Sequence, residues 1–105
     1  CILGFTGVMA DVFAVTDAAG VSPADTLRVL DFFSPAGAIT MRGKRIAEQD
    51  FTASFELAMA RKDVRLMLET AGDRPLATLP GIAARMDALL EAGHEQDDFA
   101  VIGKR

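Results

Sequence analysis

The segment Ala53–Ala71, with the sequence ASFELAMARKDVRLMLETA, decides the fold of this 105-residue chain. Apolar residues recur in it every three or four positions, and this spacing predicts a long helix with one broad apolar face. That face consists of Leu57, Ala60, Val64, Met67, Leu68 and Ala71. A narrower apolar strip lies almost opposite and consists of Phe55, Met59 and Leu66, with Lys62 on one edge and Asp63 on the other.

The narrow strip has two interpretations. In the first, Lys62 and Asp63 are surface charges beside a second packing contact. In the second, the strip faces a cleft, where Lys62 supplies a cation for an anionic cofactor or substrate. The spacing permits both.

Helical patterns continue on both sides of this segment, and no alternating strand pattern of useful length is present. Further helices are predicted at Phe5–Ala19, from Ser22 to Phe33, at Ala38–Ala47, at Pro80–Ala92 and at Gln96–Ile102. The sequence therefore predicts an all-α fold, a helical bundle of five or six helices.

Two of these helices have distinctive ends. Ser22-Pro23-Ala24-Asp25 is a typical helix start, because serine caps, proline suits the first helical position and a carboxylate is favourable in the first turn. This helix is expected to bury Leu27, Val29, Leu30 and Phe33 before Ser34-Pro35-Ala36-Gly37 interrupts the chain. The last helix is expected to begin at Asp97 or Asp98 and to pack Phe99 and Ile102.

The first predicted helix has a broad apolar face and, opposite to it, a stripe of small residues that lets a second helix approach closely. The apolar face consists of Phe5, Val8, Met9, Val12, Phe13, Val15 and Ala19, and the stripe of Gly7, Ala10, Ala14 and Ala18. Asp11 and Asp17 flank the stripe, and Gly20 is placed to end the helix. We therefore expect this helix to be covered on two sides.

Length and charge exclude several classes of function. A chain of 105 residues is one domain, too short for a complete two-domain oxidoreductase. Its net charge of −4 and scattered basic residues argue against a nucleic-acid partner, and no apolar run approaches the roughly 20 residues that a membrane span needs. The single cysteine, Cys1, cannot form an internal disulfide, which indicates a reducing compartment such as the cytoplasm.

Motifs for metal binding, nucleophilic catalysis and phosphate binding are missing. The single histidine, His94, lies in a polar loop without metal-ligand spacing, so no metal site is expected. Cys1 has no nearby base, and no glycine-rich phosphate loop occurs. Phe55, Lys62 and Asp63 remain as the candidate functional residues.

The stretch Phe51–Leu66 resembles the Lys-Asp motif region of the 3-hydroxyisobutyrate dehydrogenase family, the β-hydroxyacid dehydrogenases, in which a Phe, a Leu and then Lys-Asp-Leu follow at this spacing. Ala10–Val15 and Ala18–Val21 are similar to the family's Ala-Glu-Ala-x-x-Leu and Ala-Gly-Leu stretch. Asp97–Ala100 is similar to its C-terminal Asp-Asp-x-Ser-Ala. Asp11 stands where the family usually has Glu, Val64 stands where it usually has Leu, and residues 34–44 match only loosely.

This resemblance covers nearly the whole chain and implies the all-α C-terminal domain of an NAD(P)-dependent enzyme of the 6-phosphogluconate-dehydrogenase-like type. By the resemblance, Lys62 and Asp63 contact the cofactor, NAD or NADP, and Phe55 lies near the substrate, a small 3-hydroxy acid or the matching aldehyde or keto acid. The family's catalytic lysine falls a few residues before Cys1, so no catalytic residue is expected in this chain. An N-terminal Rossmann domain is the implied partner, and the apolar helices predict a homodimer or homotetramer.

Two alternatives stay open at the level of sequence. The chain is either part of such a dehydrogenase or a stand-alone all-α module for dimerisation or scaffolding. A third possibility keeps the architecture but changes the chemistry to imine reduction, as in related reductases.

Overall fold

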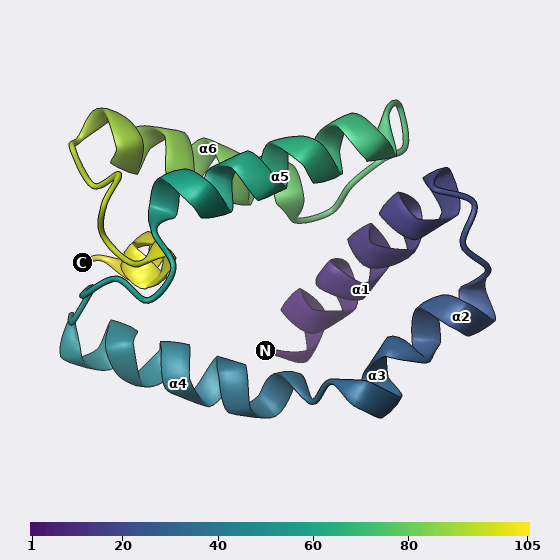
Figure 1. Ribbon diagram of the computed structural model, residues 1–105, viewed down its shortest axis with the longest axis horizontal. Coiled ribbons are helices and arrows are strands. Elements are labelled where there is room, and N and C mark those ends of the chain that lie inside the picture. Colours follow the sequence, from purple (N-terminus) through teal and green to yellow (C-terminus); the bar gives the residue numbers. More distant parts are fainter.

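Helices form almost the whole structured part of the chain. The structure, a computed structural model, describes residues 1–105 and contains no sheet; its only β-type contact is an isolated bridge between Glu56 and Asp98. The all-α prediction is confirmed (Figure 1). The elements are α1 (Ile2–Ala18), α2 (Pro23–Leu27), α3 (Val29–Phe32), α4 (Pro35–Glu48), α5 (Leu57–Ala71), α6 (Leu79–Glu91) and the 3₁₀ helix η1 (Phe99–Gly103). No helix combines the length and apolar character needed to cross a membrane.

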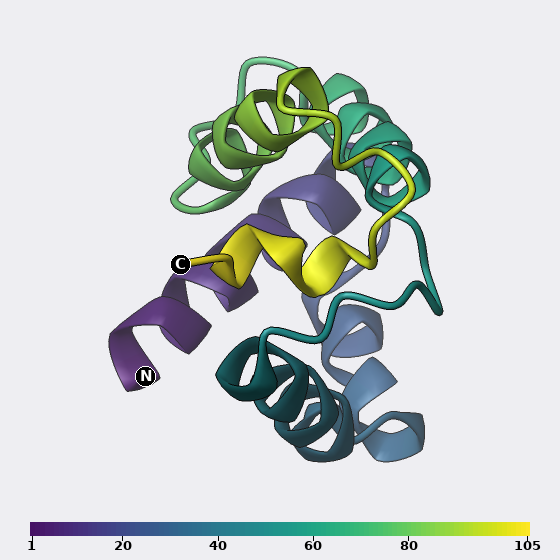
Figure 2. The ribbon, with the colours of Figure 1, turned by 90° about the vertical axis from the view of Figure 1, so that its left-hand side faces the viewer.

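The apolar core lies between α5, α6 and η1. Its buried members are Leu57, Ala60, Val64, Ala83, Met86, Leu89 and Val101. Three of them, Leu57, Ala60 and Val64, belong to the broad face predicted for α5, and α6 contributes Met86 and Leu89. Figure 2 shows η1 between the α5–α6 pair and α4, so this short helix joins the two parts of the molecule.

Asp11 fixes α1 to the start of α6. The side chain is 3% exposed, and its carboxylate accepts hydrogen bonds from the backbone N–H groups of Ala77 (2.6 Å), Thr78 (2.9 Å) and Leu79 (2.7 Å) and from the Thr78 hydroxyl (2.7 Å). Burial alone raises the pKa of this carboxyl, but the hydrogen bonds from Leu79, Ala77 and Thr78 outweigh it and leave the pKa lowered. Asp11 thus supplies the acceptor that the first N–H groups of α6 need.

Glycine at position 7 permits this close approach of α1. A Cβ atom on Gly7 would lie 2.9 Å from Cγ2 of Thr78, which is too near for an unstrained contact. One member of the predicted stripe of small residues therefore does allow close packing, although against the segment before α6.

The expected helix from Ser22 to Phe33 differs from the structure. The Ser22 cap is confirmed, because its hydroxyl accepts the N–H of Asp25 at 3.1 Å. The helical stretch is divided at Arg28 into α2 and α3, and the predicted burial is wrong: Leu27, Val29, Leu30 and Phe33 are all between 47% and 53% exposed. α3 packs mainly against α2, and these side chains lie outside the apolar core.

Helix boundaries also differ for α4 and α1. α4 begins at Pro35 rather than at the predicted Ala38. Proline is tolerated in the first turn of a helix, so Pro35 is the first residue of α4 and not part of an interruption before it. α1 is covered less than expected: Phe5 and Val8 are 42% and 43% exposed, and Asp11 is the only buried residue of the helix. The predicted end at Gly20 is confirmed, and α6 ends before Gly93, close to the predicted end at Ala92; the φ values of these glycines, 79° and 91°, suit glycine.

The Asp11 contact predicts a large effect of a small substitution. Asp11→Ala leaves four buried or half-buried donors without their acceptor and is expected to lower the free energy of unfolding by about 3 kcal/mol. Asp17→Ala, on the same helix, removes an exposed ion pair with Arg74 (3.2 Å) and is expected to cost less than about 1 kcal/mol. Urea unfolding of both variants measures the difference, and equal losses would contradict the anchoring role of Asp11.

Candidate functional site

The chain that leads into α5 is extended rather than helical, and this decides where Phe55 lies. The backbone N–H groups of Ser54 and Phe55 both donate to Oδ1 of Asp98 at 3.2 Å, and the Phe55 carbonyl accepts the N–H of Phe99 at 3.0 Å. In a helix from residue 53 the Phe55 carbonyl would accept the N–H of Met59, but here that carbonyl is bonded to Phe99. The helix therefore starts at Leu57, and the prediction that Phe55 lies on its surface is wrong.

Asp98 organises this region. Its side chain is fully buried, and Oδ2 lies 2.8 Å from Nη1 of Arg42 on α4 and 2.9 Å from the N–H of Ala100 in η1. Burial by itself raises the pKa of this carboxyl. The hydrogen bonds from Ala100, Ser54 and Phe55 together have the larger effect and lower the pKa from the ordinary value of 3.8 to about 2. The carboxylate is thus held ionised by donors from three separate parts of the chain. Of the two predicted starts of the last helix, Asp97 and Asp98, the structure has Asp98, and that helix is a 3₁₀ helix.

Three side chains stack beside Asp98. The Phe55 and Phe99 rings meet edge to face, with centroids 5.7 Å apart and an interplanar angle of 86°. The Arg42 guanidinium lies 3.9 Å from the centroid of the Phe99 ring. The Phe55 ring is held by its contact with Phe99. Because Phe55 remains 37% exposed, a ligand can still reach it.

A groove of about 410 Å³ lies next to this stack, between α4 and η1. It is lined by Ala38, Ile39, Arg42, Gly43, Ile46, Phe99, Ala100 and Ile102. Its walls are mainly aliphatic, and its one cationic group, Arg42, is already paired with Asp98.

Lys62 and Asp63 lie on α5 beyond Phe55. Lys62 is exposed and has no hydrogen bond or ion pair, whereas the neighbouring cations on the same helix are paired, Arg61 with Asp87 at 2.7 Å and Arg65 with Glu69 at 2.8 Å. Asp63 is half-buried and likewise makes no hydrogen bond. Met59 and Leu66 flank them at 46% and 45% exposure. The face with Lys62 therefore carries a free cation beside exposed apolar surface.

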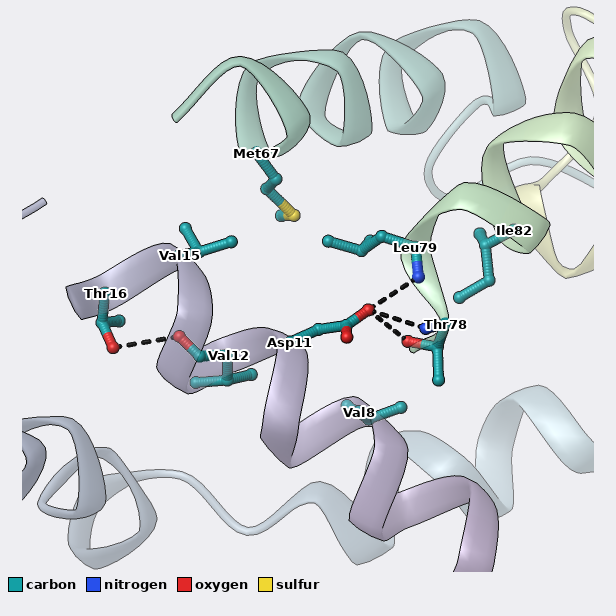
Figure 3. Close-up of a pocket in the computed structure, with 9 residues that line it drawn as sticks. All are labelled: Val8, Asp11, Val12, Val15, Thr16, Met67, Thr78, Leu79 and Ile82. Atoms are coloured by element: carbon teal, nitrogen blue, oxygen red, sulfur yellow. Dashed lines mark hydrogen bonds between the residues drawn. The ribbon is translucent and has the colours of Figure 1, made fainter. Parts of the chain in front are cut away.

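A separate crevice lies elsewhere. This crevice of about 350 Å³ is between α1, α5 and the start of α6, and Figure 3 shows the residues that line it. Aliphatic side chains make up most of the wall, and the Asp11 carboxylate is occupied by its own hydrogen bonds. Neither Phe55, Lys62 nor Asp63 reaches it, so this cavity has no group free for acid–base chemistry.

The candidate residues lie apart from both cavities. Phe55 precedes α5 and Lys62 lies in its N-terminal half; both are exposed, and neither lines the groove or the crevice. Lys62 can bind an anion, and these groups offer no nucleophile. Sequence reasoning missed Arg42 and the extent of the role of Asp98, although the acidic pair Asp97-Asp98 was recognised as a helix start.

One comparison with known proteins identifies a relationship. Residues 4–104 match the family model described as "NAD-binding of NADP-dependent 3-hydroxyisobutyrate dehydrogenase". No curated protein and no solved structure matched the chain.

The lowered pKa of Asp98 predicts loss of stability in acid. Because the folded-state pKa, about 2, lies below the ordinary value of 3.8, the stabilisation is complete above pH 4 and is lost as the pH falls toward 2. Asp98→Asn is expected to lower the free energy of unfolding at neutral pH by about 3 kcal/mol, since Arg42 loses its buried partner. Its stability should also change less than that of the wild type between pH 4 and 2.

Chemical denaturation across this pH range, followed by circular dichroism, measures both effects. Asp73→Asn, at an exposed carboxylate without a partner, is the matched control and should follow the wild-type curve. A wild-type curve that is flat below pH 4 would contradict the assignment.

Proposed function

The chain belongs to the NAD-binding family of NADP-dependent 3-hydroxyisobutyrate dehydrogenases, and on this basis we propose that it is the helical C-terminal domain of an NAD(P)-dependent β-hydroxyacid dehydrogenase. The intact protein oxidises a small 3-hydroxy acid or reduces the matching aldehyde or keto acid. The match over residues 4–104 is the observation that carries the proposal. The single cysteine is consistent with work in the reducing cytoplasm.

The side chains of Lys62 and Asp63 on α5 fit a nucleotide cofactor. Lys62 is an ammonium group without a protein partner, and such a group is free to pair with a phosphate or another anionic part of NAD or NADP. Asp63, which can only accept hydrogen bonds when ionised, takes donors from the sugar or amide groups. When bound, the nicotinamide ring supplies or accepts the hydride.

Phe55 acts on the substrate side. Its ring is held by Phe99, and its exposed edge forms an apolar wall that keeps water from the reacting carbon. Nothing in residues 1–105 is assigned to proton transfer. That role falls to a lysine that precedes Cys1 in the intact protein, together with a Rossmann domain that completes the cofactor site.

The coding sequence upstream of Cys1 provides a direct test. A glycine-rich βαβ segment, followed by a lysine shortly before Cys1, supports the proposal, whereas a start codon immediately upstream supports a stand-alone helical module. A lysine replaced by another residue indicates imine reduction. Turnover of hydroxy acids by residues 1–105 alone would contradict the proposal that the proton-transferring lysine lies outside these residues.

Substitution of Lys62 tests the cofactor contact in the intact enzyme. Lys62→Ala is expected to raise the KM for the cofactor about tenfold, because a charge-assisted hydrogen bond contributes roughly 1.5–3 kcal/mol. The thermal unfolding midpoint should stay unchanged, since Lys62 makes no contact within the domain. Lys44→Ala, at an exposed lysine on α4, is the matched control and should change neither quantity. An unchanged KM with a lowered midpoint would indicate that Lys62 has a structural role instead.

A further inference from the structure

The backbone of Phe55 is held by the segment around Asp98. The Phe55 N–H donates to Oδ1 of Asp98 at 3.2 Å, and the Phe55 carbonyl accepts the N–H of Phe99 at 3.0 Å. Two residues further along the chain, the N–H of Leu57 donates to the Asp97 carbonyl at 2.8 Å. The path of the chain through Phe55 is therefore set by these bonds.

The ring of Phe55 is not fixed by its backbone, because rotation about the side-chain torsions moves no backbone group. Burial alone does not fix the ring either, since Phe55 is 37% exposed. The ring meets the Phe99 ring edge to face, an arrangement that aromatic pairs favour over a face-to-face sandwich. The orientation of the Phe55 ring therefore depends on where the Phe99 ring lies.

Phe99 is held in turn by a residue of α4. The Arg42 guanidinium lies 3.9 Å from the centroid of the Phe99 ring, within the range of cation–π attraction. The same guanidinium donates from Nη1 to Oδ2 of Asp98 at 2.8 Å, and Asp98 is fully buried. Arg42 is thus fixed by an ion pair and contacts Phe99 with the same group.

A second arginine of α4 shows what distinguishes Arg42. The Arg45 side chain is 24% exposed, against 21% for Arg42, and lies 3.9 Å from Oδ1 of Asp98. Arg45 donates to the Thr52 carbonyl and makes no cation–π contact. Two arginines therefore offer positive charge to Asp98, and only Arg42 adds a contact with Phe99.

Apolar packing alone does not require an arginine at position 42. Replacing a desolvated ion pair by apolar side chains of similar volume is often neutral for stability. A guanidinium differs from an aliphatic side chain because it is planar and its hydrogen bonds hold it in one orientation. The arginine therefore favours a role in orienting the Phe99 ring.

We propose that Phe99 and Arg42 are positioning residues for the reaction of the intact enzyme, because together they hold the Phe55 ring in the orientation in which it covers the substrate. The proposal rests on the proposed function, in which Phe55 forms an apolar wall of the substrate site. Phe99 and Arg42 act through Phe55 and are assigned no contact with the substrate. Through Arg42, α4 contributes to the site as well.

Kinetics of the intact enzyme test the role of Phe99. Phe99→Leu removes the ring but keeps an apolar side chain and the N–H that bonds the Phe55 carbonyl. We expect kcat with the hydroxy acid to fall about tenfold, since a displacement of about 1 Å in an active site can cost about 100-fold. The KM for the cofactor should not change. Phe99→Tyr keeps the ring and should restore kcat to within about twofold of the wild type.

Phe51→Leu is the matched control for the loss of a ring. Phe51 and Phe99 both pack against the apolar core, but Phe51 makes no aromatic contact with Phe55. Phe51→Leu should therefore leave kcat unchanged, whatever its effect on the thermal unfolding midpoint. Equal losses of kcat in Phe51→Leu and Phe99→Leu would overturn the proposal, because they would follow from weakened packing.

A double-mutant cycle shows whether Phe99 acts through Phe55. In a Phe55→Leu background, Phe99→Leu should lower kcat no further, and two independent losses that multiply would overturn the proposal. Arg42→Lys keeps the positive charge but loses the planar group, so kcat should fall about threefold. Arg45→Lys is the control on the same helix and should leave kcat unchanged, and a loss equal to that of Arg42→Lys would contradict the role of the stack.

Fluorescence gives a readout that needs no turnover. The chain has no tryptophan and no tyrosine, so Phe55→Trp introduces a single probe at this position. In that background Phe99→Leu should increase the fast local rotation of the probe, measured by time-resolved anisotropy of the 105-residue chain, and Phe51→Leu should not. Unchanged anisotropy in Phe99→Leu would overturn the proposal. Absence of turnover by the wild-type intact enzyme would overturn the proposed function, whereas turnover with an unchanged kcat in Phe99→Leu would overturn the positioning role alone.

Discussion

Asp98 lies where three parts of the chain meet, and its buried carboxylate accepts hydrogen bonds from each of them. The lead-in to α5 donates through Ser54 and Phe55, η1 donates through Ala100, and α4 donates through Arg42. Since α4 packs mainly against η1, this group helps to set the position of α4 relative to α5. The same contact holds the backbone of Phe55, whose ring packs against Phe99. Fold and candidate site are therefore stabilised by the same charge.

The prediction of the fold from sequence succeeded where local pattern and tertiary packing agree. α5 and α6 have a strong helical period, and their broad faces form the core that the period predicts. The ends at Gly20 and Gly93 follow from the conformational freedom of glycine. For α2 and α3 the pattern alone was misleading, because Leu27, Val29, Leu30 and Phe33 are apolar but lie outside the core and stay about half exposed.

The candidate site shows a similar division. The position of Lys62 beside an apolar strip left two roles open, and the structure leaves its side chain without a partner. The position of Phe55 could not be inferred, because it depends on hydrogen bonds to a residue 43 positions later in the chain. Asp11 was misjudged for the same reason: a helical wheel places it beside small residues, whereas its partners at Ala77 to Leu79 are distant in sequence. Contacts between a side chain and a remote backbone leave no periodic signal.

In the hydrogen bonds of the two buried carboxylates, Asp11 and Asp98, the donors and the acceptors differ in kind. Apart from Arg42 and the hydroxyl groups of Ser54 and Thr78, their donors are backbone N–H groups, which every residue type except proline provides. Side chains at positions such as 77, 79 and 100 can therefore vary in polarity without removing a hydrogen bond. The acceptors, in contrast, are single side chains that only an ionised acid of the right length can replace. At these contacts, substitution is thus tolerated on the donor side and not at the carboxylate. The shape of the chain therefore depends more on the chemical identity of Asp11 and Asp98 than on that of the residues that donate to them.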